Sequence, residues 1–255
     1  MDPLSINLLT PFNGRLDDLI CIINKNINEL APGDKWIIVL DNLKENPGEF
    51  HLDDRITYLN YEGSRGAGNA RNFGLNYIED SVEFPSLLLP IDGDDLLVPG
   101  SLDIIRKNFV ESKDNMISFG HVKEWSTRKL VISYDGRFNI DDLLKKYITP
   151  CGSTVLKISN KLILKKFRFS RRKRSNDNLF FMQAAKYFGG FKCNPCPVLI
   201  YKVGNPKSLS GKKYKQIFYK YLALRDFGLG RIRSIYLLWF YVITGIKRYI
   251  LKRSI

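Results

Sequence analysis

Histidine and cysteine are scarce in this chain of 255 residues, which has two histidines and four cysteines. Four scattered cysteines are too few to form a disulfide framework in a domain of this size. Cys193 and Cys196 have the spacing of a redox or zinc half-site, but no second pair exists, so packing within the fold is favoured. Neither histidine lies beside a candidate nucleophile, so a general base is expected to be a carboxylate.

Acidic residues are also in short supply: 26 Asp and Glu stand against 40 Lys and Arg, a formal net charge of +14. The partner is therefore expected to be anionic, either nucleic acid, a phosphorylated small molecule or an acidic lipid surface. The first thirteen residues have no basic segment before an apolar stretch, which predicts a cytoplasmic protein without a secretory signal. The length suits one α/β domain with a small appendage.

Short apolar runs alternate with a helix-like pattern in the first hundred residues. Residues 16–30 predict an amphipathic helix, and residues 10–14 form a cluster of turn formers. Strands are expected at residues 5–9, 36–40, 55–61 and 86–91. Strand, helix, strand in this order predicts a parallel sheet. Further on, residues 116–122 and 130–134 suggest a hairpin, residues 179–188 a helix and residues 198–203 a last strand.

Three carboxylates, those of Asp92, Asp94 and Asp95, follow the buried strand at residues 86–91. In an open α/β sheet, ligands bind at this carboxyl edge of the strands. Hard cations such as Mg²⁺ and Mn²⁺ prefer carboxylate oxygens and can bridge the phosphates of a nucleotide. A solvated acidic turn is the alternative. The apolar strand before it and the shortage of acid elsewhere favour a metal and diphosphate site.

The glycine-rich segment 66–74 does not match the established phosphate loops. Arg71 stands where a dinucleotide fingerprint needs glycine, and the Gly-Lys-Ser/Thr of a P-loop is absent. What remains is a turn at a helix N-terminus near Arg65 and Arg71, which suits an anionic ligand. A tight strand-to-helix connection without a ligand is the alternative.

Taken together, these segments resemble the family 2 glycosyltransferases with the GT-A fold, of the type that builds bacterial cell-surface polysaccharides such as lipopolysaccharide or capsule. The resemblance spans about residues 5 to 210 and rests on the order and spacing of its pieces. These are residues 8–13, 37–42, 66–74 and 89–95, the pair Asn176 and Asp177, and Tyr201-Lys202 with residues 208–210. The chain departs from the family pattern at Asn42 and Asn176, where acids are common, and at Gly204, where histidine is frequent.

The resemblance implies a mixed, mostly parallel, Rossmann-like sheet flanked by helices. Residues 1–210 would form the catalytic domain, with a nucleotide-binding half at about 1–100 and an acceptor half at about 101–210. It implies Asp94, with Asp92, as ligands of Mn²⁺ or Mg²⁺ and Asp177 as the catalytic base. The implied contacts to the donor nucleotide come from Thr10, Pro11, Phe12, Asn13, Asp41, Asn42, Gly66, Arg71, Asp92 and Gly93.

The expected reaction is a single displacement with inversion, in which a hexosyl or N-acetylhexosaminyl group moves from a nucleotide-sugar donor, with a UDP-sugar favoured. The acceptor is expected to be a hydroxyl of a lipid-linked saccharide or polysaccharide. Its diphosphate would meet the basic stretch before Asp177, because guanidinium groups bind phosphate oxygens in pairs. The candidate acceptor residues are Arg171, Arg172, Arg174 and Asn176.

Residues 211–255 form a basic, aromatic segment with a single acid, Asp226. Its apolar run at 235–246 is shorter than a typical membrane span of about 20 residues. A helical anchor in the plane of an anionic membrane, at the inner face of the cell membrane, is expected. A helical pair packed on the catalytic domain is the alternative.

Two other classes of protein share part of this pattern. A nucleic-acid-binding protein would explain the charge but not the strand ending in Asp92, and no nucleic-acid partner is expected. A nucleotidyltransferase acting on sugar phosphates would share the sheet and the carboxylates, but the chain has no lysine-bearing glycine-rich signature near its N-terminus.

Overall fold

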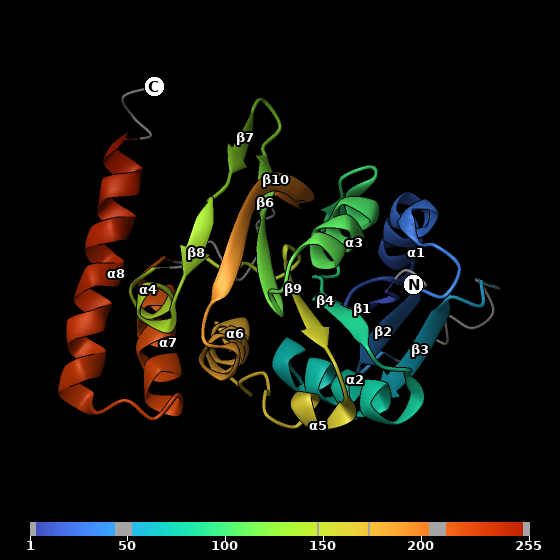
Figure 1. Cartoon of the computed structure of the whole chain (residues 1–255), viewed down its shortest axis with the longest axis horizontal. Coiled ribbons are helices and arrows are strands. Elements are labelled where there is room, and N and C mark those ends of the chain that lie inside the picture. The colour runs from blue at the N-terminus through green and yellow to red at the C-terminus, as the bar shows by residue number, and fades with distance from the viewer. Residues whose placement is uncertain (1–3, 44–52, 147, 173, 204–212, 252–255) are drawn as a thin grey trace.

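The computed structural model describes residues 4–43, 53–146, 148–172, 174–203 and 213–251. One mixed sheet forms the centre of the molecule, with strand order β3-β2-β1-β4-β9-β6-β10-β5 (Figure 1). The first four of these strands run parallel, as the strand-helix-strand order predicts. They are β1 (Ile6–Phe12), β2 (Lys35–Asp41), β3 (Ile56–Tyr61) and β4 (Ser86–Pro90).

The other half of the sheet mixes both directions. β9 (Thr154–Ile158) lies antiparallel between β4 and β6 (Met116–Glu124), and β6 runs parallel to β10 (Phe191–Lys202). The expected hairpin is confirmed, because β7 (Lys129–Ile132) pairs antiparallel with β6. Two short strands, β5 (Leu96–Leu97) and β8 (Gly136–Phe138), complete the sheet as antiparallel partners of β10.

Helices cover both faces of the sheet (Figure 1). One face carries α1 (Leu16–Asn26), its 3-10 extension η1 (Ile27–Glu29) and α3 (Ser101–Glu111); the other carries α2 (Ala67–Ser81), α5 (Lys161–Leu164) and α6 (Asn176–Phe188). Side chains that alternate along a strand divide between the two cores: Leu8 packs with the α1 side and Leu9 with the α2 side. The predicted mixed α/β architecture is confirmed.

Three element boundaries differ from the sequence expectation. β1 continues through Pro11 to Phe12, whereas the sequence predicts a turn from residue 10. The strand tolerates Pro11 because β4 pairs only with Ile6–Leu9, so that β1 has a neighbouring strand on one side alone at the proline. β10 begins at Phe191, seven residues early, and accommodates Pro195 and Pro197 through shifts of register against β6. α6 begins at Asn176 instead of residue 179.

The C-terminal segment is helical, as predicted, and it packs on the rest of the molecule. α7 (Lys213–Asp226) and α8 (Arg231–Leu251) stand beside α6 and α4 (Ile140–Lys145) (Figure 1). Ala223, Leu224 and Leu237 are buried in the same core as the side chains of α6. The proposed boundary at residue 210 lies outside the described residues. Within the described chain, no helix is both long and apolar enough to cross a membrane.

Candidate active site

The carboxyl ends of three parallel strands meet at one edge of the sheet. Phe12 pairs with Leu40, and Leu9 pairs with Pro90, so the loops after β1, β2 and β4 leave the sheet together. These loops carry Asn13, Asn42 and the acidic segment 92–95. The sheet therefore brings together the loops that the sequence assigned to the donor nucleotide.

Asp41 organises the loops around this edge. Its carboxylate accepts a hydrogen bond of 2.9 Å from the backbone N–H of Gly66 and one of 2.8 Å from the Asn42 amide, and its carbonyl accepts one of 2.6 Å from Asn13. Asp41 is buried whereas Asn42 is exposed in the left-handed conformation at φ 57°. Asn42, with Asn13, is thus better placed than Asp41 to reach a base.

The predicted pocket residues of β1 lie mostly beneath the site. Thr10 is buried, and its hydroxyl accepts a hydrogen bond of 2.9 Å from the indole N–H of Trp36. Pro11 and Phe12 are buried strand residues. A Cβ at Gly93 would lie 2.9 Å from the Phe12 ring and 3.1 Å from the Pro11 carbonyl, so the acidic loop crosses directly over the end of β1. Here glycine permits the close approach.

The acidic loop concentrates negative charge. Asp92 is 40% exposed, Asp94 is exposed and Asp95 is buried. Partial desolvation by the surrounding protein, followed by the Asp92 charge, raises the pKa of Asp94. Burial, reinforced by Asp92 and Asp94, raises the pKa of Asp95 well above its usual value. The Oδ1 atom of Asp95 has no hydrogen-bond partner among the described residues.

This loop has the chemistry of a site for a hard divalent cation. Asp92 and Asp94 offer carboxylate oxygens, and the charge that accumulates with buried Asp95 would be offset by a cation. The described part of the chain contains no group of three ligating side chains. Two carboxylates agree with Mg²⁺ sites, which use one or two carboxylates and complete the coordination with waters and substrate phosphates. The residues present therefore fit Mg²⁺ or Mn²⁺ bound together with a diphosphate.

Arg71 links the acidic loop to the other half of the molecule. Its side chain, 3% exposed, projects from α2 and forms an ion pair with Asp92. A second guanidinium nitrogen donates a 2.8 Å hydrogen bond to the Asn176 side chain on α6, and the group lies 5.1 Å from the centre of the Phe169 ring. The sequence placed Arg71 against the donor diphosphate; the structure gives it two protein partners, through which it positions the loop.

Asp177 lies in the first turn of α6, next to Asn176. Ser170 connects this turn to α2. Gly68 of α2 lies so close to the Ser170 carbonyl that a Cβ at this position would overlap it. The backbone N–H of Ser170 donates a 3.0 Å hydrogen bond to the backbone carbonyl of Asn176. The candidate base is thus carried by the same turn that Arg71 ties to Asp92.

Cys151 lies beneath the end of β4, from which the acidic loop leaves. This buried thiol lies 3.5 Å from the Pro90 carbonyl. Burial raises its pKa strongly, and the charges of Asp92, Asp177 and Asp95 raise it further, against the opposing effect of Arg71. Sequence reasoning missed this residue because its role depends on segment 149–153 folding back beneath β4, where Gly152 donates a 2.6 Å hydrogen bond to Pro90.

The basic stretch predicted to bind an acceptor is divided by the structure. Arg172 forms a bidentate ion pair with Asp226 at the end of α7, with N to O distances of 2.6 and 2.7 Å, and Asn176 bonds to Arg71. Arg171 is exposed, while Arg174 is half-buried and its Nη1 has no hydrogen-bond partner among the described residues. Arg171 and Arg174 remain the better candidates for acceptor phosphate.

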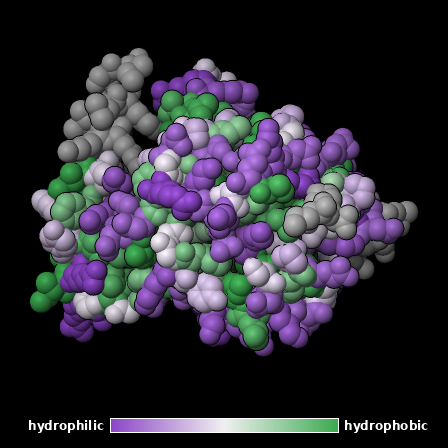
Figure 2. Space-filling model, in the orientation of Figure 1, coloured by the Kyte–Doolittle hydropathy of each residue, from purple (hydrophilic) through white to green (hydrophobic). Residues whose placement is uncertain are grey.

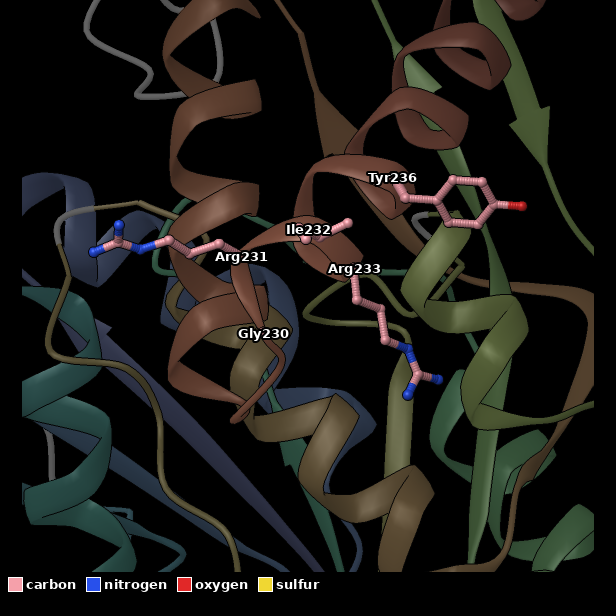
Figure 3. A pocket seen from close by; sticks show the side chains of 5 residues that line it. All are labelled: Gly230, Arg231, Ile232, Arg233 and Tyr236. Atoms are coloured by element: carbon pink, nitrogen blue, oxygen red, sulfur yellow. The ribbon is translucent and has the colours of Figure 1, made fainter.

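A separate depression of about 820 Å³ opens at the start of α8 (Figure 3). It is shallow and lined by Gly230, Arg231, Ile232, Arg233 and Tyr236. Nothing in this lining resembles the acidic loop, so the depression belongs to the outer surface of the C-terminal helices.

Comparison with solved structures identifies the fold. A crystal structure of S. aureus TarS residues 1–349 in complex with UDP-GlcNAc superposes with a TM-score of 0.66 at 14% identity, covering 92% of this chain and 70% of that one. The same fragment in complex with UDP gives 0.62 at 14% identity, with the same coverage. A longer TarS structure, of which this chain covers 42%, also gives 0.62.

The fold is of the GT-A type. This agrees with the architecture that the sequence resemblance implied. Comparison with protein-family models gave no match, and neither did comparison with curated protein sequences. At 14% identity the likeness to TarS establishes the glycosyltransferase fold and not membership of family 2.

Replacing Arg71 by lysine tests the bridge. Lysine keeps the charge, but its single ammonium group cannot reproduce the two separate hydrogen bonds that the planar guanidinium donates to Asp92 and Asn176. The buried side-chain oxygen of Asn176 therefore loses its donor. We expect the free energy of unfolding to fall by about 1–3 kcal/mol, as measured by urea denaturation.

Arg15→Lys is the matched control, because Arg15 forms an exposed ion pair with Asp18. Exposed pairs contribute about 1 kcal/mol or less, so this variant should be nearly as stable as the wild type. Equal effects of the two substitutions would show that the buried bridge does not stabilise the fold.

Proposed function

We propose that this protein is an inverting glycosyltransferase that moves a sugar from a nucleotide-diphosphate donor, a UDP-sugar, to a hydroxyl of a lipid-linked saccharide. One observation carries the proposal: the acidic loop after β4 and the turn bearing Asp177, 85 residues apart, are joined by Arg71 at the carboxyl edge of a GT-A sheet. The TarS structures solved with UDP-GlcNAc and UDP support the choice of donor.

The nucleotide would lie over the ends of β1 and β2. Asn13 and Asn42 offer amide groups to the base, while Asp41 holds their loops and the Gly66 turn in place. Asp92 and Asp94 would hold Mg²⁺ or Mn²⁺, which when bound neutralises charge on the departing diphosphate. Arg71, by holding Asp92, fixes the orientation of this acidic loop before the donor arrives.

Asp177 is the proposed base. Its carboxylate would take the proton from the acceptor hydroxyl as the hydroxyl oxygen attacks the anomeric carbon and the bond to the diphosphate breaks. Such general base catalysis contributes about 10²- to 10⁴-fold in rate. Attack from the side opposite the leaving group inverts the configuration at the anomeric carbon.

The outer face of α8 supports an acceptor held at a membrane. Large apolar side chains recur there at helical spacing, and their exposure reaches 86% at Ile232 and 65% at Trp239. In Figure 2 the left flank, where α8 lies, carries apolar side chains beside strongly hydrophilic ones. The exposed apolar residues of this face are Ile232, Ile235, Tyr236, Trp239 and Phe240.

The partner that fits this face is an anionic lipid surface. Arg231 and Arg233 border the apolar residues at the start of α8, and the chain as a whole carries +14. Apolar contact and attraction of cations to anionic headgroups add together in such anchors. We therefore place the enzyme at the cytoplasmic face of a membrane, where a lipid-linked acceptor would be within reach.

Donor binding is expected to depend on the metal. A UDP-sugar with Mn²⁺ should raise the melting temperature of the wild type, because a ligand that binds only the folded state stabilises it. The Asp94→Asn variant should lose the part of this rise that Mn²⁺ adds, and EDTA should abolish transfer by the wild type. Full transfer in the presence of chelator would exclude a metal-dependent reaction.

The Asp177→Asn variant tests the base. It should lower turnover by at least about a hundredfold while the affinity for the donor changes little, as measured by initial rates and donor titration. Asp80→Asn, which alters an exposed carboxylate on α2, should behave as the wild type. Near-normal turnover by Asp177→Asn would assign Asp177 to helix capping.

The membrane contact is tested by substitution, because the packing of Leu224 and Leu237 in the core makes deletion of the helices a test of folding. Replacing both Ile235 and Trp239 by glutamine removes exposed apolar area while keeping a good helix former. Partitioning onto anionic vesicles should fall by about tenfold, as measured by co-sedimentation.

Val110→Gln, at an apolar position on α3 that is 72% exposed, is the control and should sediment as the wild type does. Binding of the wild type should also weaken as salt rises. If the double variant sediments like the control, or if neutral vesicles bind the wild type equally well, α8 is not a contact for anionic lipid.

A further inference from the structure

Lys220 is the most unusual charged residue of the C-terminal helices. Its side chain is 1% exposed, although the sequence placed it among the cations of a surface anchor. Burial lowers its pKa to about 8, against the opposing effect of the Asp177 charge. An ammonium held inside a protein at this cost calls for a function beyond stability, since apolar groups of similar volume often serve stability as well or better.

The ammonium joins four helices. From α7, Lys220 donates a 3.1 Å hydrogen bond to the side-chain oxygen of Asn178 on α6 and a longer one, of 3.4 Å, to the Leu143 carbonyl on α4. It also lies 5.7 Å from the centre of the Tyr241 ring on α8. Among the described residues, Asp177 supplies the charge that acts on the Lys220 ammonium. α4 contributes a carbonyl dipole, and α8 contributes an aromatic face.

The Asn178 amide transmits this contact to Asp177. An ammonium can only donate hydrogen bonds, so Asn178 must turn its oxygen toward Lys220 and its NH₂ group away. The amide nitrogen then lies 3.5 Å from Asp177 Oδ1, at the long end of hydrogen-bond distances. Lys220, Asn178 and Asp177 therefore form a directed chain in which the cation sets the orientation of the amide.

The same arrangement occurs on the other side of Asp177. Asn176 accepts a hydrogen bond from Arg71, as Asn178 does from Lys220, and both asparagines are 8% exposed. The candidate base thus lies between two buried amides, each held by a buried cation. Arg71 comes from the nucleotide half and Lys220 from the C-terminal helices.

We propose that Lys220 is a positioning residue for the transfer reaction: acting through Asn178, it orients the Asp177 carboxylate and favours its ionised form. The proposal rests on the proposed function of Asp177 as base. It makes α7 part of the catalytic machinery, because without this helix the chain from cation to base is incomplete. The effect should appear in turnover, while donor binding at the other end of the site should change little.

The first experiment replaces Lys220 by methionine, which has a similar length and no charge. We expect kcat to fall by at least about tenfold with little change in KM for the donor, and the acidic limb of the pH profile to move to higher pH, because a nearby cation favours a carboxylate. The melting temperature should fall only modestly, because removing a buried charge offsets part of the loss of the donor to Asn178.

Two further variants separate positioning from folding. Lys186→Met removes the other lysine that joins α6 to the end of α7, where it lies 5.6 Å from the Phe227 ring, and should leave kcat unchanged. Asn178→Asp keeps the shape and the contact to Lys220 but removes the amide donor facing Asp177, so kcat should fall although Lys220 is present. Normal kcat in Lys220→Met, or a loss matched by Lys186→Met, would overturn the proposal.

The second experiment does not depend on activity. The pKa of Lys220 can be followed by NMR of ¹³C-labelled lysine, with Lys220→Met to assign the signal. Asp177→Asn should lower that pKa, because the carboxylate stabilises the ammonium. An unchanged pKa would overturn the coupling. If the wild type transferred no sugar from any nucleotide donor, the proposed function would fail, while this titration would still decide whether Lys220 and Asp177 interact.

Discussion

The buried guanidinium of Arg71 is the constraint on which the rest of the site depends. A charge that is 3% exposed has to find an opposite charge and hydrogen-bond acceptors within the protein, because bulk water no longer solvates it. It finds Asp92 in the loop after β4 and Asn176 at the start of α6. These groups belong to different halves of the chain, so satisfying one cation fixes the two halves relative to each other.

Charge is distributed around that bridge in a consistent way. Carboxylates gather at the strand ends, where the pKa of buried Asp95 and that of Asp94 are raised by desolvation and by the charge of Asp92. Cations lie behind the first turn of α6, hidden from solvent. A divalent cation would offset the first group, and the second favours a carboxylate at Asp177. The site is thus electrostatically suited to leaving-group departure at one end and proton removal at the other.

The sequence predicts the parallel half of the sheet well because its evidence is local. β2 and β4 are built on continuous apolar runs, and the loop residues follow directly from them. The sequence does not predict β9, because only its long-range pairing with β4 and β6 places these five residues in the sheet. Of the candidate site, Asp94 and Asp177 are identifiable from motifs, but the partners of Arg71 and the burial of Lys220 depend on contacts between distant segments. Composition alone does not distinguish the buried Lys220 from the other lysines after residue 211.

The C-terminal helices connect the exposed outer face of α8 to the turn that carries Asp177. One side of α8 supplies Leu237 to the core, while its outer side exposes Ile232 and Trp239. α7 contacts the same core and carries Lys220 to the turn of the candidate base. A membrane surface that binds the outer side of α8 would therefore also fix the position of Lys220, because α7 and α8 pack on the same core. Binding to a membrane and orienting the base would then be two consequences of one packing arrangement.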